Sequence, residues 1–168
     1  MKTILKVGIM AIVLMASYQA SEASAQFFFL KNPLIGKPAK NFTLKTLKGE
    51  EKNLTQLRNG GNAIVFFWAT WCPHCREQLH QLKQMGAEIE KKGIKIILVD
   101  LEESDKQVQA YVDKQQISFT VLLDEEATVG EQYEVVGVPT LIFIDKAGVV
   151  KAVEHSVPDN YETIFSKG

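Results

Sequence analysis

Residues 63–75 decide the fold, and they read Ala-Ile-Val-Phe-Phe-Trp-Ala-Thr-Trp-Cys-Pro-His-Cys. Residues 63–68 form an unbroken apolar run, which is typical of a central strand that is buried on both faces. Pro73 suits the first turn of a helix, and a helical pattern of apolar residues follows it. Cys72 therefore lies where a buried strand ends and a helix begins, which is where α/β sheets place their chemistry.

The rest of the sequence alternates between strand and helix patterns. Strands are predicted over residues 41–47, 63–68, 94–100, 119–123, 140–145 and 149–155. Helices are predicted over residues 53–57, 73–92, 105–116 and 127–133, with a short one at the C-terminus. The long helix is expected to face the core with Leu79, Leu82, Met85, Ala87 and Ile89. Strands separated by helices pair in parallel, and the hairpin of the last two strands adds antiparallel ones. The sequence thus predicts an α/β fold with a mixed central sheet flanked by helices.

The two cysteines of the chain, Cys72 and Cys75, are predicted to be redox-active. A disulfide between them would stabilise little, because the stabilisation grows with the length of the closed loop. Free backbone N–H groups and the dipole at a helix N-terminus favour a thiolate at Cys72. We therefore assign Cys72 as the nucleophile and Cys75, one turn further in and more buried, as the thiol that resolves the mixed disulfide. Pro73 and His74 are expected to tune the redox potential, since the imidazole can act on the Cys72 sulfur.

Other uses of the cysteine pair have less support in the sequence. A zinc site or a metal chaperone would recruit His74, His80 or His155, but neither a second Cys-x-x-Cys pair nor paired histidines are present. Haem attachment needs a histidine directly after the second cysteine, and that residue is Arg76. A thiol peroxidase has a threonine at a fixed spacing before its cysteine, and the spacing between Thr70 and the cysteine that follows it differs from that. We expect no metal and no cofactor besides the disulfide.

A second candidate feature is the run Val-Gly-Val-Pro-Thr at residues 136–140, just before a predicted strand. One interpretation is a rigid turn. The other is a cis peptide bond between Val138 and Pro139, because cis bonds are nearly confined to proline and gather in tight turns. In that case the Val138 backbone is free to pair with an extended substrate, and we expect Trp71, Val138 and Pro139 to form the substrate groove.

The N-terminal residues have the pattern of a targeting segment. Lys2 and Lys6 precede an apolar stretch at residues 7–16, and Ala23 and Ala25 supply the small residues of a cleavage site. Residues 1–25 are therefore predicted to be a signal peptide. The alternative is an uncleaved membrane anchor, although a spanning helix needs about 20 apolar residues. Either reading predicts a periplasmic protein.

The remainder is expected to fold as one unit behind a short lead-in. Residues 26–40 are predicted to be extended, with the apolar residues 27–30 packed against the edge of the domain formed by residues 41–168. The chain has 168 residues, 46% of them hydrophobic, which suits one domain. Its net charge of −1 gives no support to nucleic-acid binding. We expect a monomer that acts on protein thiols and disulfides.

Three segments together resemble the TlpA/ResA-like branch of the thioredoxin superfamily. They are Trp-Ala-Thr-Trp-Cys-Pro-His-Cys-Arg at residues 68–76, the residues Gly36-Lys37-Pro38-Ala39 and Asn41-Phe42-Thr43-Leu44 before it, and Gly137-Val138-Pro139-Thr140 after it. The resemblance covers residues 34–155. It implies a thioredoxin-like fold, a periplasmic or membrane-facing location, a cis Pro139 and exchange with protein disulfides. It also implies reductase activity supported by a membrane electron donor.

Several residues depart from that family pattern. Gln78 stands where the branch usually has Glu, His80 where a Pro is frequent, and Phe66 where thioredoxin has a buried Asp. Glu77, Asp100 and Glu102 are candidates for a general base to Cys75, although each is expected on the solvated surface.

The dipeptide Pro73-His74 resembles the oxidant DsbA, whose potential is about −120 mV, against about −270 mV for thioredoxin. The sequence predicts a reductase and leaves open the alternative of an oxidant of secreted proteins.

Overall fold

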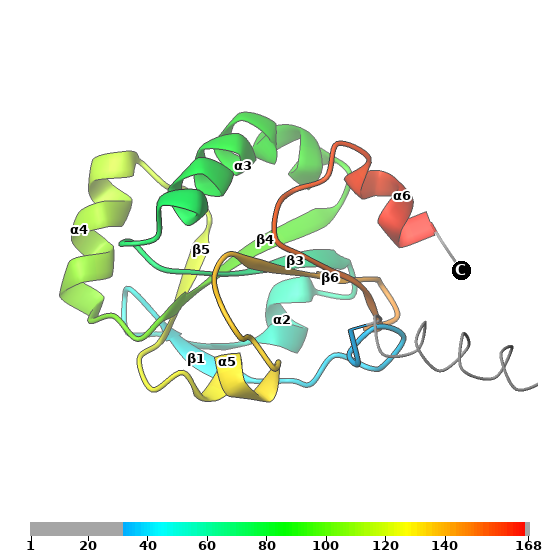
Figure 1. The fold of residues 1–168 in the computed structure, drawn as a ribbon, viewed down its shortest axis with the longest axis horizontal. Helices are drawn as coiled ribbons and strands as arrows, with labels where there is room; N and C mark the ends of the chain where they lie inside the picture. The colour runs from blue at the N-terminus through cyan, green and yellow to red at the C-terminus, as the bar shows by residue number, and fades with distance from the viewer. Residues whose placement is uncertain (1–31, 167–168) are drawn as a thin grey trace, which may run out of the picture. The chain divides into compact units, whose positions relative to one another are not determined.

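A mixed sheet of seven strands lies at the centre of the computed structural model, which describes residues 32–166 (Figure 1). The strands are β1 (Thr43–Thr46), β2 (Glu51–Asn53), β3 (Asn62–Trp68), β4 (Ile94–Leu101), β5 (Thr120–Asp124), β6 (Thr140–Ile144) and β7 (Val150–Glu154). Their order is β2-β1-β5-β4-β3-β6-β7, with β3, β4 and β5 parallel and the outer pairs antiparallel. The predicted fold class is therefore confirmed.

Helices cover both faces of this sheet. They are α2 (Leu54–Arg58), α3 (Pro73–Lys91), α4 (Asp105–Gln115), α5 (Thr128–Gln132) and α6 (Tyr161–Ser166). In Figure 1, α3, α4 and α6 lie on one side of the sheet, and α2 and α5 lie on the other. Apolar residues of the first three helices belong to one core cluster, and those of α2 and α5 belong to the second. Each predicted helix and strand is present within a few residues of its expected bounds. β2 was not expected, because its three residues carry no apolar pattern.

β3 is buried on both faces, as its unbroken apolar run predicts. Its residues alternate between the two clusters, since successive side chains of a strand point to opposite faces. Ile64, Phe66 and Trp68 belong to the cluster under α3, whereas Ala63, Val65 and Phe67 belong to the other, and all six are 0% exposed. β3 therefore runs through the middle of the core and ends just before the cysteine pair.

The prediction for the buried face of α3 was wrong at one position. Ala87 is exposed, and Gly86 lies in the core in its place. A side chain at Gly86 has no room, because its Cβ would lie 2.7 Å from the ring of Phe119. Counting apolar side chains along a helix misses such a contact, since glycine brings no side chain to count.

The lead-in segment runs beside β7 in the described part of the chain. After a turn at residues 33–36, Gly36 N–H donates to the Val150 carbonyl at 2.8 Å, and Val150 N–H donates to the Lys37 carbonyl at 2.9 Å. The predicted signal peptide and the apolar residues 27–30 lie outside the described residues. Between residues 32 and 166 no helix has the length and apolar character needed to cross a membrane.

Candidate active site

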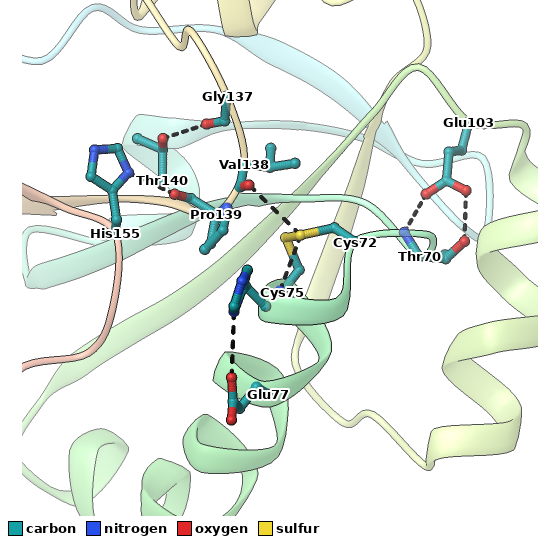
Figure 2. The surroundings of a disulfide bond; sticks show 11 residues. Thr70, Cys72, Cys75, Glu77, Glu103, Gly137, Val138, Pro139, Thr140 and His155 are labelled. Atoms are coloured by element: carbon teal, nitrogen blue, oxygen red, sulfur yellow. Dashed lines mark hydrogen bonds and ion pairs between the residues drawn. A yellow bond between two sulfur atoms is a disulfide. The ribbon is translucent and has the colours of Figure 1, made fainter.

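Cys72 and Cys75 form a disulfide at the start of α3, with their Cα atoms 5.2 Å apart (Figure 2). Cys72 is the N-cap residue of α3, and Pro73 occupies the first helical turn, where its missing N–H costs no hydrogen bond. The backbone N–H of Cys75 donates to Cys72 Sγ at 3.1 Å. The helix terminus therefore already directs one donor at this sulfur, and such a donor favours a thiolate in the reduced protein.

The two cysteines differ in their access to solvent. Cys75, in the first turn of α3, is fully buried, whereas Cys72 is 4% exposed. Cys72 also follows Trp71, whose side chain is 64% exposed. A turn closed by the hydrogen bond from Cys72 N–H to the Ala69 carbonyl, at 3.2 Å, carries Trp71 out of the core. Of the two sulfurs, that of Cys72 is the one beside the surface.

The loop before β6 lies opposite the disulfide. The Val138–Pro139 peptide bond is cis, as expected from the sequence. The Val138 carbonyl oxygen lies 3.7 Å from Cys72 Sγ, and Figure 2 shows both loop residues facing the sulfur atoms. The hydroxyl of Thr140 donates to the Gly137 carbonyl at 2.7 Å, and His155 Nδ1 lies 2.8 Å from the Pro139 carbonyl oxygen. These bonds hold the loop against Cys72.

Hollows flank this loop on two sides. One is lined by His74, Gln78, Pro139 and His155, together with residues 136–138. The other is lined by Trp71, Leu101, Glu102 and Glu131, among others, and it shares residues 136–138 with the first. Val136, at 98% exposed, forms the rim between them. Trp71, Val138 and Pro139, the residues predicted to form a groove, thus line hollows beside the disulfide.

His74 and Gln78 make contacts that the sequence does not reveal. His74 Nδ1 pairs with Glu77 Oε2 at 3.6 Å, and the two side chains are 82% and 75% exposed. The ion-pair partner described for the imidazole is thus Glu77, and His74 also lines the hollow beside Pro139. Gln78 Oε1 accepts a hydrogen bond from Val157 N–H at 2.8 Å. Gln78 therefore ties α3 to the segment before α6.

Asp100 corrects one expectation from the sequence, because it is fully buried and not solvated. Burial raises its pKa to about 9, and the charge of the neighbouring Glu103 carboxyl adds to the shift. Glu77 and Glu102 are exposed as expected. Asp100 ends a buried apolar run at the same sheet edge as Cys72, and this position was the available signal for its burial.

Glu103 is a site residue that sequence reasoning missed. Its carboxylate accepts hydrogen bonds from the Thr70 backbone N–H and from the Thr70 hydroxyl, the latter at 2.6 Å (Figure 2). It also accepts one from the side-chain amide of Gln107. Glu103 is 5% exposed. It therefore anchors the turn that leads into Cys72 to the segment before α4.

The described residues offer no ready metal site. Within residues 32–166, no group of three or more His, Cys, Asp or Glu side chains is arranged to hold a metal ion. The redox-active group that the structure does contain is the Cys72–Cys75 disulfide.

Comparison with known sequences places this chain among thiol–disulfide proteins. The sequence profile of the AhpC/TSA family matches residues 35–153. Thioredoxin-like protein YneN of Bacillus subtilis (strain 168) is 32% identical over 120 residues, which cover 70% of this chain and 69% of that protein. Thiol-disulfide oxidoreductase ResA of Halalkalibacterium halodurans is 32% identical over 118 residues, which cover 70% of this chain and 66% of that protein. The chain thus spans about two thirds of the length of these relatives.

A solved structure gives the same assignment. A crystal structure from Chlorobium tepidum, described as that of a thiol:disulfide interchange protein DsbE, superposes with a TM-score of 0.69 at 27% identity. The superposition covers 77% of this chain and 92% of that one. Profile, sequence and structural similarity together show that this chain belongs to the AhpC/TSA family, among its thioredoxin-fold thiol–disulfide oxidoreductases.

Proposed function

We propose that this protein is an exported oxidoreductase that reduces disulfides of protein substrates through its Cys-Pro-His-Cys dithiol. The observation that carries the proposal is the setting of Cys72. Cys72 is the N-cap residue of α3, and its sulfur accepts a hydrogen bond from Cys75 N–H. The same sulfur lies 3.7 Å from the Val138 carbonyl oxygen, beside Pro139. This setting supports a stabilised thiolate next to backbone groups that can hold an extended peptide.

The reaction proceeds in two exchange steps. The Cys72 thiolate attacks one sulfur of a substrate disulfide, so that a mixed disulfide forms and the first substrate thiolate leaves. Cys75 then loses its proton and attacks Cys72 Sγ, which forms the Cys72–Cys75 disulfide and releases the second substrate thiolate. Two electrons pass from the dithiol to the substrate, and the released thiolates take up protons.

The burial of the two cysteines supports this division of labour. Cys75 is inaccessible to a protein substrate at 0% exposure, but it is placed to reach Cys72 Sγ from within the helix. The exposed Trp71 and Val136 flank the hollows beside Pro139. We assign Trp71, Val138 and Pro139 to the substrate groove, where the Val138 backbone pairs with the substrate chain.

The family resemblance supports electron flow from this protein to its substrate. ResA and DsbE, to which the chain is similar, are named for thiol–disulfide exchange, and the family resemblance implies a reductant. In this role the oxidised protein is recharged by a membrane electron donor. We further propose export by the predicted signal peptide, a periplasmic location and a monomeric state.

The second candidate is an oxidant of secreted proteins, and the residues Pro73 and His74 favour it. A cation beside Cys72 stabilises the reduced form and makes the disulfide more oxidising. The described position of His74 weakens this alternative, because its imidazole pairs with Glu77 and is 82% exposed. A solvent-exposed side chain acts weakly on a neighbouring sulfur through electrostatics.

The equilibrium redox potential of the Cys72–Cys75 pair tests the direction. A reductase is expected to give a value close to that of thioredoxin, about −270 mV. The potential can be measured in glutathione or dithiothreitol buffers by thiol alkylation. A value close to about −120 mV would instead identify the protein as an oxidant.

Trapping of mixed disulfides tests the roles of the two cysteines. The Cys75→Ser variant is expected to accumulate a covalent complex with a disulfide-containing polypeptide through Cys72. The matched Cys72→Ser variant should form none, because Cys75 is buried. Trapping by Cys72→Ser and not by Cys75→Ser would reverse the assignment.

A further inference from the structure

A pair of buried carboxyl groups lies behind the cysteine turn. Asp100 is 0% exposed and Glu103 is 5% exposed. Neither carboxyl oxygen of Asp100 has a hydrogen-bond donor among the described residues. An ionised carboxylate in this position would be costly, since a buried charge needs donors or a counter-charge. The Glu103 carboxyl acts on Asp100 as a neighbouring like charge, so the two groups either share a proton or repel each other.

The sheet brings Asp100 to the same edge and face as the cysteine pair. In the parallel register of β3 and β4, Asp100 lies opposite Trp68, the last residue of β3. Leu98, two residues before Asp100, belongs to the core cluster that also contains Cys72 and Cys75. Because side chains two apart on a strand share a face, Asp100 faces the helix-α3 side of the sheet.

A left-handed turn brings Glu103 back toward the cysteine turn. Glu102 has a φ of 61°, a conformation that non-glycine residues adopt rarely. After this turn, Glu103 accepts the two hydrogen bonds from Thr70 and the one from Gln107. With its oxygens used as acceptors, Glu103 needs a proton on Asp100 for the two carboxyl groups to bond to each other.

We propose that Asp100 and Glu103 form a proton-sharing carboxyl pair that positions the Ala69–Cys72 turn, and with it the attacking sulfur. Both are positioning residues, because they act on Cys72 through Thr70. Protonated Asp100 donates to Glu103 and holds that side chain against Thr70. Loss of this proton places two buried negative charges side by side, which drives Glu103 away from the turn. The inference rests on the proposed role of Cys72 as the attacking thiol.

Glu103 is the charged side chain that acts on Asp100. Burial is the largest cause of the raised pKa of Asp100, and the Glu103 carboxyl is the charged group that adds to it. Trp68, opposite Asp100 in the register, packs on Tyr111 of α4 at 5.6 Å between ring centroids. On α3, Arg76 lowers the pKa of Tyr111 against the larger effect of burial and is not among the groups that act on Asp100.

Infrared spectroscopy of the wild-type protein tests the shared proton without any variant. Ordinary aspartate and glutamate side chains are ionised at pH 7. We expect the C=O band of one protonated carboxylic acid at pH 7, which disappears as the pH rises through about 9. Asp100→Asn should remove the band at pH 7, whereas the exposed control Asp159→Asn should retain it. Absence of the band from wild type would overturn the carboxyl pair.

Alkylation of Cys72 by iodoacetamide in the reduced protein tests the positioning. Glu103→Gln turns an amide N–H toward the Thr70 donors, so the turn loosens and the pKa of Cys72 rises. We expect the rate at pH 7 to fall by about fivefold, as for the loss of one buried hydrogen bond. The exposed control Glu90→Gln should react like wild type. A wild-type rate for Glu103→Gln would overturn the positioning role.

The pH profile of the same reaction separates positioning from a merely structural effect. Wild type should show a second step close to pH 9, which reports the ionisation of Asp100. Asp100→Asn retains a donor toward Glu103 and cannot ionise, so it should lose this step and slow the reaction less than Glu103→Gln does. A step that persists in Asp100→Asn would overturn the assignment. None of these measurements requires a protein substrate, so failure of the proposed reductase activity would be seen separately, in the potential and the trapping experiment.

Discussion

Two polar pairs flank Cys72, and they differ in their exposure to water. In the first turns of α3, His74 and Glu77 are 82% and 75% exposed. Behind the cysteine turn, Asp100 and Glu103 are 0% and 5% exposed. Water screens the first pair, so its members act weakly on each other and on the sulfur. The second pair lies in a medium of low dielectric constant, where a single proton decides whether the two groups attract or repel. Asp100 and Glu103 are therefore expected to affect the surroundings of Cys72 more than His74 and Glu77 do.

The largest expected effect is on the pH dependence of stability. The pKa of Asp100 is raised from 3.8 to about 9, so between these values the folded protein holds a proton that the unfolded chain has released. The associated stability is fully present below about pH 4 and is lost as the pH rises through about 9. In this window the free energy of unfolding should fall by about 1.4 kcal/mol per pH unit relative to Asp100→Asn. Urea unfolding of both proteins from pH 4 to 9 measures the difference, and parallel pH profiles would contradict it.

The next effect compares the two acidic partners directly. Glu103→Ala leaves the Thr70 donors and the Gln107 amide without an acceptor, and it should lower the free energy of unfolding by about 3 kcal/mol. Glu77→Ala removes only an exposed ion pair and should cost about 0.5 kcal/mol or less. Chemical denaturation at pH 7 measures both. Equal losses would show that burial does not distinguish the two pairs.

A smaller effect is expected inside the motif. His74→Pro removes the imidazole from the first turn of α3, where proline is tolerated, and should make the Cys72–Cys75 potential more reducing. Because the imidazole is exposed, the shift should be about 20 mV or less. Redox titration against glutathione measures it. A shift that approaches the difference of about 150 mV between DsbA and thioredoxin would show that the imidazole contacts the sulfur in the reduced protein.

The smallest effect concerns the partner of that histidine. Glu77→Gln removes a negative charge near the start of α3, and it should make the potential more oxidising by less than about 10 mV. The shift should vanish in 1 M salt, where the screening length is about 3 Å. A shift that survives high salt would mean that Glu77 acts through a contact shielded from solvent.

The sequence predicts the elements of this fold well wherever apolar periodicity is strong. The run at residues 63–68 and the helix that starts at Pro73 were both placed within one residue of their observed starts. β2 was missed because Glu51 and Lys52 resemble a polar loop, and its strand form depends on pairing with β1. Gly86 was missed because its role is to leave space for Phe119. Both failures concern contacts between segments, which no local pattern records.

The site shows the same limit. The position of Cys72 follows from a local motif and was predicted correctly, whereas the motif at Pro139 left a rigid turn open and the family resemblance implied the observed cis bond. The burial of Asp100 and the bonds of Glu103 to Thr70 were not predicted, since they depend on the β3–β4 register and on the left-handed turn at Glu102. The side chain of a charged residue at the end of an apolar run can be buried in the core or exposed to solvent. Which of the two occurs depends on how the neighbouring strand pairs with it.

The outer edges of the sheet have a consequence for a protein proposed to work on extended chains. An exposed strand edge recruits other extended polypeptides and nucleates aggregates. Here residues 36–39 pair through backbone hydrogen bonds with residues 148–150 at the start of β7, and the opposite edge, β2, is three residues long and begins Glu51-Lys52. The outer edges of the sheet therefore offer only short lengths of strand to an extended chain. A substrate chain is thus expected to pair with the Val138 backbone beside the disulfide and not with the margins of the sheet.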